Sequence, residues 1–420
     1  MARELTGREK RRLALLGLPT FGLALSITTV STYLPSVIQG VTSSTIVIGA
    51  VVGGEGVMAL WTPLVVGPWS DQLRTPIGGR LPFLLVGVPL VAAALVLMGL
   101  AGSLAAIAAA AAVFFLAYFI AYEPYRAMYP DLLRADEVAG RAQSTQAIWR
   151  GAATGTALLA GGFLLDATQI APFAAAAVVA LAATAVFAWI VVTSGLVHEE
   201  GRRGDETLRG VAGRLRNLVA EHPALRTYLV VNGLWELAIA ALKTFVVLYL
   251  TVGLGHSLLA ASAVVGGVGL IVLAGAAAAG KLGDRFGHLL VVRRCLWMFG
   301  LGLLVPAFVT FEPAVAAIVP FIALGGGAVM ALAYAILMPL MPEEDRGALT
   351  GFYSVSRGIG ITIGPVLAGV MISVLGSGVF ESTRGYQATW LVCSAAILLS
   401  IPGVRRLERE HRDRERLAAR

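Results

Sequence analysis

Apolar segments of about 20 residues recur along the whole 420-residue chain, separated by short polar or Gly/Pro-containing breaks. A segment of this length crosses the hydrocarbon core of a bilayer as a helix. Lipid offers the backbone no hydrogen-bond partners, so membrane-spanning chains form helices or closed barrels, and continuous apolar runs without period-two alternation favour helices. The mean hydropathy of +0.81, with 57% hydrophobic and 14% charged residues, agrees. The sequence therefore predicts an all-α membrane protein.

We expect twelve transmembrane helices. The first six are predicted at residues 13–37, 45–68, 81–101, 103–127, 143–166 and 171–195. The second six are predicted at residues 224–252, 258–281, 289–311, 313–338, 348–375 and 387–404.

The basic residues predict the orientation of these spans, because Lys and Arg near span ends stay on the cytoplasmic side. With twelve spans, every Lys and Arg except Lys243 and Arg384 falls on the same side of the membrane. Both termini are therefore predicted to be cytoplasmic. The net charge of +7 reflects this topology, and no nucleic-acid partner is expected.

The longest polar loop divides the chain into two halves. We predict an N-terminal six-helix bundle at 1–195, a cytoplasmic linker at 196–222, a C-terminal six-helix bundle at 223–404 and a charged cytoplasmic tail at 405–420. Within the linker, apolar residues between Leu208 and Val219 recur at helical spacing opposite several arginines, which predicts an amphipathic helix at the membrane surface. A plain solvated linker is the alternative.

Three polar motifs occur in the same order in both halves. Gly67 and Asp71 follow the second span, as Gly280 and Asp284 follow the eighth. PDLLRADEVAGRAQ follows the fourth span and MPLMPEEDRGALTG the tenth, while WRG at 149–151 corresponds to SRG at 356–358. This order predicts two parallel six-helix repeats, the pattern of transporters that alternate access around a midplane site.

The segment VGPWSDQLRTPIGGRLP at 66–82 resembles the loop signature of the major facilitator superfamily, and GDRFG at 283–287 resembles its second-half copy. Two stretches, GPWSDQLRTPIGGRLPF and YEPYRAMYPDLL, are similar to those of sucrose/proton symporters and glycoside-pentoside-hexuronide cation symporters. The resemblance implies the major facilitator fold and symport of a sugar with a cation. The chain departs from the pattern at Gln72, where the superfamily usually has Arg.

The resemblance and the repeat also imply gating roles for charged residues of the cytoplasmic motifs, namely Asp71, Arg74, Arg80, Arg126, Asp131, Asp284, Arg285 and Arg357. We expect Asp71 to cap a helix N-terminus or to pair with a basic residue. For Arg357 we expect an acidic partner in the other half, and for Arg126 the alternative is snorkelling to the cytoplasmic surface.

Two acidic residues are candidates for cation coupling, Glu55 and Glu123. Glu55 lies about ten residues into the second span, where desolvation penalises the charged form and favours proton uptake. Its place also resembles that of a cation-binding acidic residue in melibiose-type permeases. A single carboxylate favours a proton over sodium, which needs several oxygen ligands. The alternative for Glu55 is a structural pair with Arg150 or another base.

Substrate contact is predicted for Trp149, Arg150, Asn232, Trp235, Glu236, Lys243 and Tyr353. At 100° per residue, Asn232, Glu236 and Lys243 share one face of the seventh span. Arg150 resembles the sugar-binding Arg of melibiose-type permeases, and its guanidinium fork can hold two hydroxyls or a carboxylate. A hydrated interhelical network without substrate contact is the alternative.

These features predict a secondary active transporter that carries a sugar, glycoside or similar small polar solute by proton-coupled symport. The alternatives are a proton-driven exporter of drugs or hydrophobic metabolites, whose Gly-Pro signature is missing from the fifth span, and a non-transporting membrane sensor. We expect no enzyme activity, cofactor or metal site, since no such constellation occurs. We expect a monomer. Because Arg far outnumbers Lys, as in GC-rich bacteria, we expect it to lie in the plasma membrane of a bacterium, that is, the inner membrane.

Overall fold

The computed structural model describes residues 13–131, 136–194, 208–342, 349–376 and 378–418. Among these residues, eleven helices are long and apolar enough to cross a membrane. The expected all-α membrane fold is confirmed, and the helix ends lie within a few residues of the predicted ones over most of the chain.

The long helices of the first half are α2 (Leu18–Gln39), α3 (Thr45–Gln72), α4 (Leu81–Leu100), α5 (Leu104–Asp131), α6 (Asp136–Ala167) and α7 (Ala171–Thr193). Those of the second half are α9 (Pro223–Leu248), α10 (Leu258–Phe286), α11 (His288–Gly302), α13 (Glu312–Leu337), α14 (Leu349–Leu375) and α15 (Ala388–Ala418). Short elements join them, namely η1 (Tyr249–Gly253), α12 (Leu304–Phe308), η2 (Met338–Leu340) and η4 (Glu381–Thr383).

The predicted fifth span corresponds to α6, which is not among the eleven apolar helices. Its 32 residues are more than a bilayer requires. Arg150, Thr154, Thr156 and Asp166 make it more polar than its neighbours. The twelve predicted spans therefore correspond to eleven apolar helices and one long, more polar helix.

A helix also occurs in the predicted linker, α8 (Leu208–Glu221). Leu218 is buried while Arg214 and Arg216 are exposed, as an amphipathic helix requires. Its position at a membrane surface stays a prediction.

Contacts within the chain divide it into two compact units. Unit 1 comprises Met1–Val41 and Trp61–Leu208, and unit 2 comprises Thr42–Leu60 and Arg209–Arg420. Helix α3 thus contributes its first part to unit 2 and the remainder to unit 1. The predicted bundles at 1–195 and 223–404 stay a prediction, and the units differ from them in where residues 42–60 belong.

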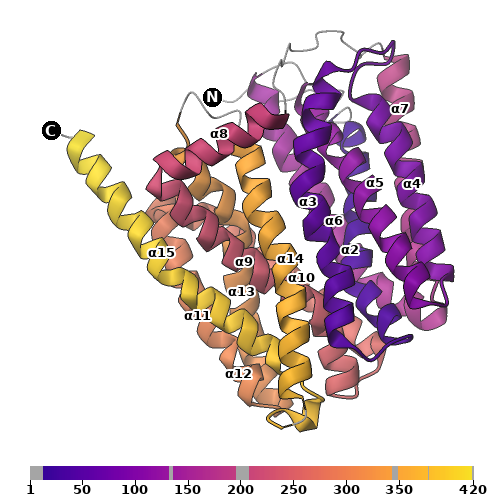
Figure 1. Ribbon diagram of the computed structural model, residues 1–420, viewed down its shortest axis with the longest axis vertical. Helices are drawn as coiled ribbons and strands as arrows, with labels where there is room; N and C mark the ends of the chain where they lie inside the picture. Colours follow the sequence, from indigo (N-terminus) through magenta and orange to yellow (C-terminus); the bar gives the residue numbers. More distant parts are fainter. Residues whose placement is uncertain (1–12, 132–135, 195–207, 343–348, 377, 419–420) are drawn as a thin grey trace. The chain divides into compact units, whose positions relative to one another are not determined.

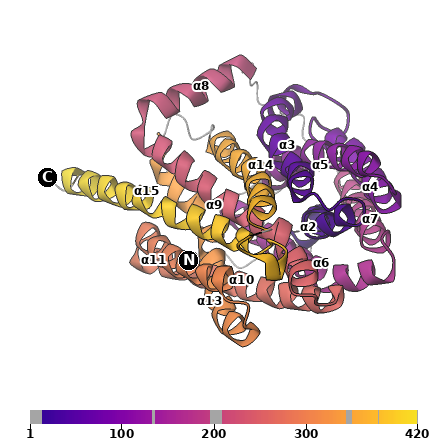
Figure 2. The same cartoon turned by 60° about the horizontal axis from the view of Figure 1, so that its bottom comes forward.

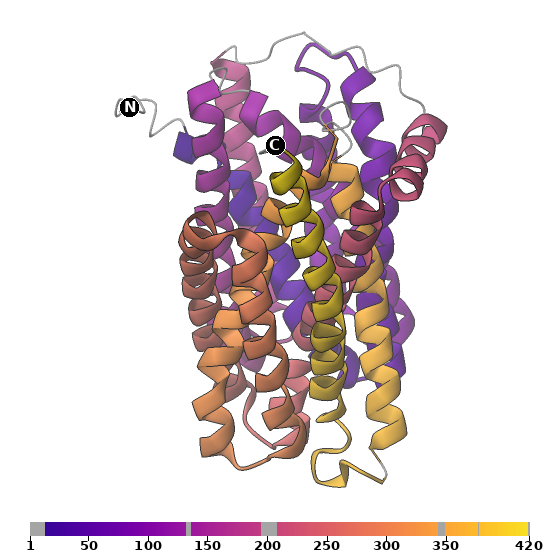
Figure 3. The same ribbon diagram turned by 90° about the vertical axis from the view of Figure 1, so that its left-hand side faces the viewer.

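The helix pairs within the two units follow the same pattern. In unit 1, α2 packs against α6 and α7, and α4 packs against α5 and α7 (Figure 2). In unit 2, α9 packs against α14 and α15, and α11 packs against α13 and α15 (Figure 1). Figure 3 shows α15, in yellow, running beside the orange helices of its unit. The sequence repeat is therefore also a repeat of helix packing.

Helix α14 is in backbone contact with two neighbours inside unit 2. A Cβ added to Gly360 would lie 2.7 Å from Glu236 Cβ and 2.8 Å from Leu237 N on α9. On another side, a Cβ at Gly53 of α3 would lie 2.8 Å from the Thr362 carbonyl oxygen. Thr45 Oγ1 also donates to the Gly369 carbonyl oxygen at 2.7 Å. Small residues permit such close helix approach in membranes.

We expect Gly360→Ala to lower the thermal stability of the purified protein by several degrees, because the added methyl group would overlap backbone that cannot move freely. Overpacking of this kind costs about 1–3 kcal/mol. Thermal unfolding in detergent is the measurement.

The matched control is Gly267→Ala in α10, where an added Cβ would have no atom within 4 Å. This variant gains helix propensity without a clash, so the midpoint of its thermal unfolding should stay unchanged or rise. Equal midpoints for both variants would contradict the close contact at Gly360.

Candidate functional site

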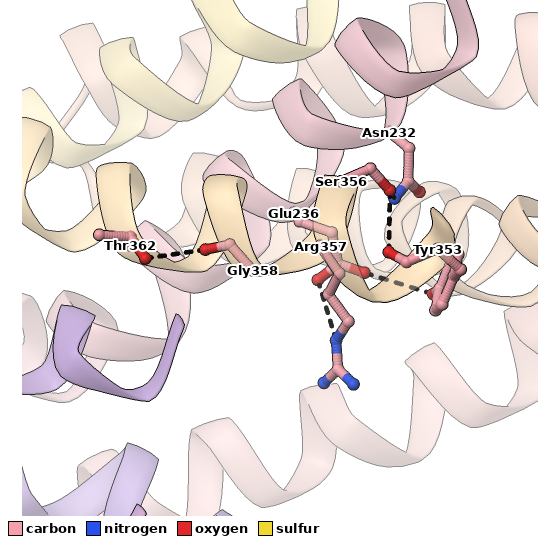
Figure 4. A network of polar contacts seen from close by, with 7 residues as sticks. All are labelled: Asn232, Glu236, Tyr353, Ser356, Arg357, Gly358 and Thr362. Carbon is pink, nitrogen blue, oxygen red and sulfur yellow. Dashed lines mark hydrogen bonds and ion pairs between the residues drawn. The ribbon is translucent and has the colours of Figure 1, made fainter. Parts of the chain in front are cut away.

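A polar network joins α9 to α14 inside unit 2 (Figure 4). Asn232 Nδ2 donates to Ser356 Oγ at 2.7 Å, and this hydroxyl donates to the Tyr353 carbonyl oxygen at 2.9 Å. Asn232 and Ser356 are completely buried. This part of the network fixes the register between the two helices.

Glu236 is the acidic centre of the network. Tyr353 donates its hydroxyl to Glu236 Oε1 at 3.4 Å, and Arg357 Nε lies 3.7 Å from Glu236 Oε2 (Figure 4). The Glu236 side chain is 15% exposed and that of Arg357 35%, so the pair is reachable from outside the unit. Glu236 and Arg357 belong to the same half, and the expected acidic partner of Arg357 in the other half stays a prediction.

Two further charged residues act on Glu236. Lys243 attracts its carboxylate and Glu55 repels it. Lys243 is exposed on α9, whereas Glu55 is only 5% exposed. Glu55 precedes Gly56, whose added Cβ would clash with α14 at Thr362. The structure thus brings four of the predicted residues, Glu55, Glu236, Lys243 and Tyr353, into one region with Arg357.

Trp149 and Trp235 use their indole N–H groups inside their own units. Trp235 donates to Ser400 Oγ at 2.9 Å and is 1% exposed, which ties α9 to α15. Trp149 donates to the Ala14 carbonyl oxygen at 3.1 Å. Trp235 therefore has almost no surface open to a solute, whereas Trp149 is half-buried.

Arg150 and Glu123 belong to unit 1. The Arg150 guanidinium donates to the Tyr122 hydroxyl and lies 5.6 Å from the centre of that ring. Tyr122 in turn stacks on Tyr118 at 5.3 Å. Glu123 Oε2 lies 4.0 Å from Arg126 Nη1 on the same helix. Both predicted residues are therefore engaged with neighbours on α5.

The predicted gating loop in unit 1 contains a close ion pair. Arg80 donates from Nε and Nη2 to Asp71 Oδ1 at 3.0 and 2.7 Å. Asp71 thus pairs with a basic residue, one of its two expected roles. A Cβ at Gly79 would lie 2.8 Å from the Ser70 carbonyl oxygen, so this position needs glycine for the loop to return to Arg80. Arg74 is exposed.

The second-half copy of this loop has different contacts. Asp284 Oδ1 lies 3.4 Å from His288 Nε2, and the Arg285 guanidinium lies 5.1 Å from the centre of the Phe286 ring. Asp131 ends α5, but its side chain lies outside the described residues. Ser356 is not among the predicted site residues, although the SRG motif at 356–358 contains it.

A surface pocket of about 440 Å³ lies at the far end of α14 in unit 2, where Ser44, Ser373, Glu381 and Arg384 are among its lining residues. Its lining residue Ser373 is about 24 Å along α14 from Arg357, at 1.5 Å per residue. The pocket is therefore separate from the Glu236 network, which carries the buried charges.

The family model of the Major Facilitator Superfamily matches residues 16–322 and 237–420 of the chain. The chain belongs to the major facilitator superfamily. It is therefore a secondary transporter and a multi-pass integral membrane protein, and no enzyme. A comparison with curated protein sequences finds no match.

Solved structures of transporters share the fold. A mutant of the nucleoside transporter NupG is similar with a TM-score of 0.76 at 14% identity, covering 95% of this chain and 99% of that one. An occupied, inward-facing bacterial homologue of the human lysosomal transporter Spinster gives 0.73 at 13%, covering 97% and 98%. A D-xylose–proton symporter gives 0.71 at 15%, covering 94% and 97%. At such identities the likeness shows the fold alone.

We expect the charges of Asp71 and Arg80 to be exchangeable. Asp71→Arg and Arg80→Asp should each lower the thermal midpoint, because two like charges then face each other, and the double variant should regain part of the loss. For a half-exposed pair the coupling energy is on the order of 1 kcal/mol or less. Thermal unfolding at low and high salt measures it.

Arg74→Asp provides the matched charge change at an exposed neighbouring position. If the double variant loses as much stability as the two single variants lose together, the ion pair contributes nothing.

Proposed function

We propose that this transporter couples a proton to the symport of a small polar solute such as a sugar or glycoside. The observation that carries the proposal is a buried Glu55 carboxyl within electrostatic range of the Glu236 carboxyl, which itself lies 3.7 Å from Arg357. Glu55 is the proton carrier, and Glu236 with Arg357 forms the solute-binding group.

An ionised carboxylate inside a membrane costs several kcal/mol unless it is paired or hydrated. In the part of the chain that the structure describes, the Glu55 side chain makes no hydrogen bond or ion pair. Proton uptake removes its charge and with it the repulsion that Glu55 exerts on Glu236. The protonation state of Glu55 thus alters the strength with which Glu236 holds its cations.

The solute-binding group offers complementary hydrogen-bonding chemistry. Arg357 supplies donors, Glu236 supplies acceptors, and Tyr353 supplies a hydroxyl and an aromatic face. Hydroxyl groups of a sugar can both donate and accept, so they suit such a mixed site. The D-xylose–proton symporter and the nucleoside transporter NupG, each 15% identical, are examples of this fold in transporters of polar solutes.

Glu55→Gln should abolish proton uptake driven by solute addition, because the amide cannot bind and release a proton. The measurement is external pH around proteoliposomes when a pentose, hexose or glycoside that stabilises the protein is added. Retention of solute-driven proton uptake in Glu55→Gln would overturn the coupling role.

The matched control is Glu312→Gln, which removes a carboxylate that is 62% exposed at the start of α13. Solute-driven proton uptake should survive in this variant. Loss in both variants would point to a general defect in reconstitution or folding.

Arg357→Gln and Glu236→Gln should each weaken solute binding by tenfold or more, since each leaves the other charge without its partner. Solute exchange across the membrane without a proton gradient measures this binding separately from coupling. Exchange should persist in Glu55→Gln. Unchanged exchange in both network variants would exclude Glu236 and Arg357 from the solute site.

A further inference from the structure

The surface pocket of about 440 Å³ in unit 2 lies where the start of α3 meets the end of α14. Residues 43–45 line it from α3, and Ile372, Ser373 and Gly376 line it from α14. Its volume is within the range of about 300–1,000 Å³ that is typical of small-molecule sites. The twelve-span topology predicts this end of both helices on the side of the membrane opposite the termini. The pocket is therefore a candidate binding site apart from the Glu236 network.

The loop between α14 and α15 forms one wall of the pocket and is held firmly in place. Thr383 Oγ1 is 3.2 Å from Gln387 Oε1, and Gln387 Nε2 donates to the Pro306 carbonyl oxygen of α12 at 3.2 Å. Thr383 and Gln387 are only 1% and 3% exposed. A Cβ added to Gly385 would overlap the Ile372 carbonyl oxygen. The loop is thus fixed against both α12 and α14.

Arg384 in this loop has a backbone conformation that arginine rarely adopts. Its φ is 50°, the only positive φ of a non-glycine residue in the part of the chain that the structure describes. A left-handed conformation costs roughly 1–2 kcal/mol in a residue with a Cβ. Residues of this kind concentrate at functional sites, where the surrounding structure holds them in place. The conformation points to a use for the Arg384 side chain, which lines the pocket.

Glu381 and Arg384 bring opposite charges to the same pocket. They are three positions apart, yet among the described residues neither side chain forms an ion pair or a hydrogen bond. Both side chains are exposed. The helix ends add partial charges, positive at the start of α3 and negative at the end of α14. A ligand that complements this pocket therefore needs both a negative and a positive group.

We propose that the pocket binds a small zwitterion, a molecule with one carboxylate and one ammonium group, such as an amino acid. Arg384 and the start of α3 bind the carboxylate, and Glu381 binds the ammonium. The two groups of the ligand span the gap that keeps Glu381 and Arg384 from pairing directly. The bound molecule connects the start of α3 to the end of α14. This site is independent of the proton and solute groups of the proposed function.

Thermal-shift titrations of the purified full-length protein test the ligand class. The probes are three amino acids with increasing charge separation, namely glycine, γ-aminobutyrate and ε-aminocaproate. The matched compounds are butyrate, which lacks the ammonium, and butylamine, which lacks the carboxylate. At least one amino acid should stabilise the protein at concentrations tenfold or more below those of butyrate and butylamine.

Variants of the pocket test its location. Arg384→Gly removes the guanidinium at a position whose φ suits glycine, so this variant should fold normally. Arg384→Gly and Glu381→Gln should each weaken the stabilisation tenfold or more, because each leaves one charge of the ligand without its partner. Ser373→Phe, which fills the pocket from α14, should abolish it. The control Glu312→Gln changes a carboxylate that is 62% exposed and is not among the lining residues, and it should leave the titration unchanged.

Hydrogen exchange tests whether the ligand connects the two helices. With the stabilising amino acid bound, the amides at the start of α3 should exchange more slowly in the wild type and at an unchanged rate in Arg384→Gly. Solute-driven proton uptake should persist in Arg384→Gly, which separates this site from the proposed function.

Four results would each overturn the proposal. They are equal stabilisation by butyrate or butylamine, no stabilisation by any of the three amino acids, an undiminished effect in Arg384→Gly or Ser373→Phe, and unchanged exchange at the start of α3. Loss of proton uptake in a folded Arg384→Gly would overturn the independence of the site. If Glu55→Gln keeps proton uptake while amino-acid binding depends on Arg384, the coupling role fails and the pocket assignment holds.

Discussion

The close approach of α14 to its neighbours is the constraint on which the rest of unit 2 depends. Gly360 and Gly364 bring α14 against the backbone of α9, and Gly53 and Gly56 of α3 approach it near Thr362. Side chains at these four positions would hold the helices apart. The polar network forms because the two helices are close enough for the short side chain of Asn232 on α9 to reach Ser356 on α14.

The close packing of α9 and α14 also determines where the charged side chains of unit 2 meet. A carboxylate and a guanidinium face each other between these two closely packed helices, with Arg357 Nε 3.7 Å from Glu236 Oε2. Glu55 reaches the same region because the first part of α3 belongs to unit 2. The glycines and the ionisable groups lie close together in sequence, since Gly53 and Gly56 flank Glu55 and Gly360 follows Arg357 by three positions.

The helices could be predicted from sequence because hydropathy and length determine which segments enter a bilayer, and the polar character of α6 follows from Arg150 and Asp166. The shared face of Asn232 and Glu236 followed from helical periodicity. The partners could not be predicted, since the contact of Glu236 with Arg357 depends on how α9 and α14 pack. The division of α3 at Leu60 also depends on tertiary contacts, which a hydropathy pattern does not contain. The ion pair of Asp71 and Arg80 was anticipated only as one of two possible roles.

The glycine contacts of α14 also bear on kinetics. Glycine has no side-chain rotamers, so a helix contact lined by glycines immobilises fewer side chains than one built from large residues. A contact of this kind can separate and re-form without the repacking of interlocked side chains. A surface built from Leu and Phe would need such repacking each time. The segment of α3 that lies on α14 therefore loses less side-chain entropy at this contact than an interlocked surface of large side chains would.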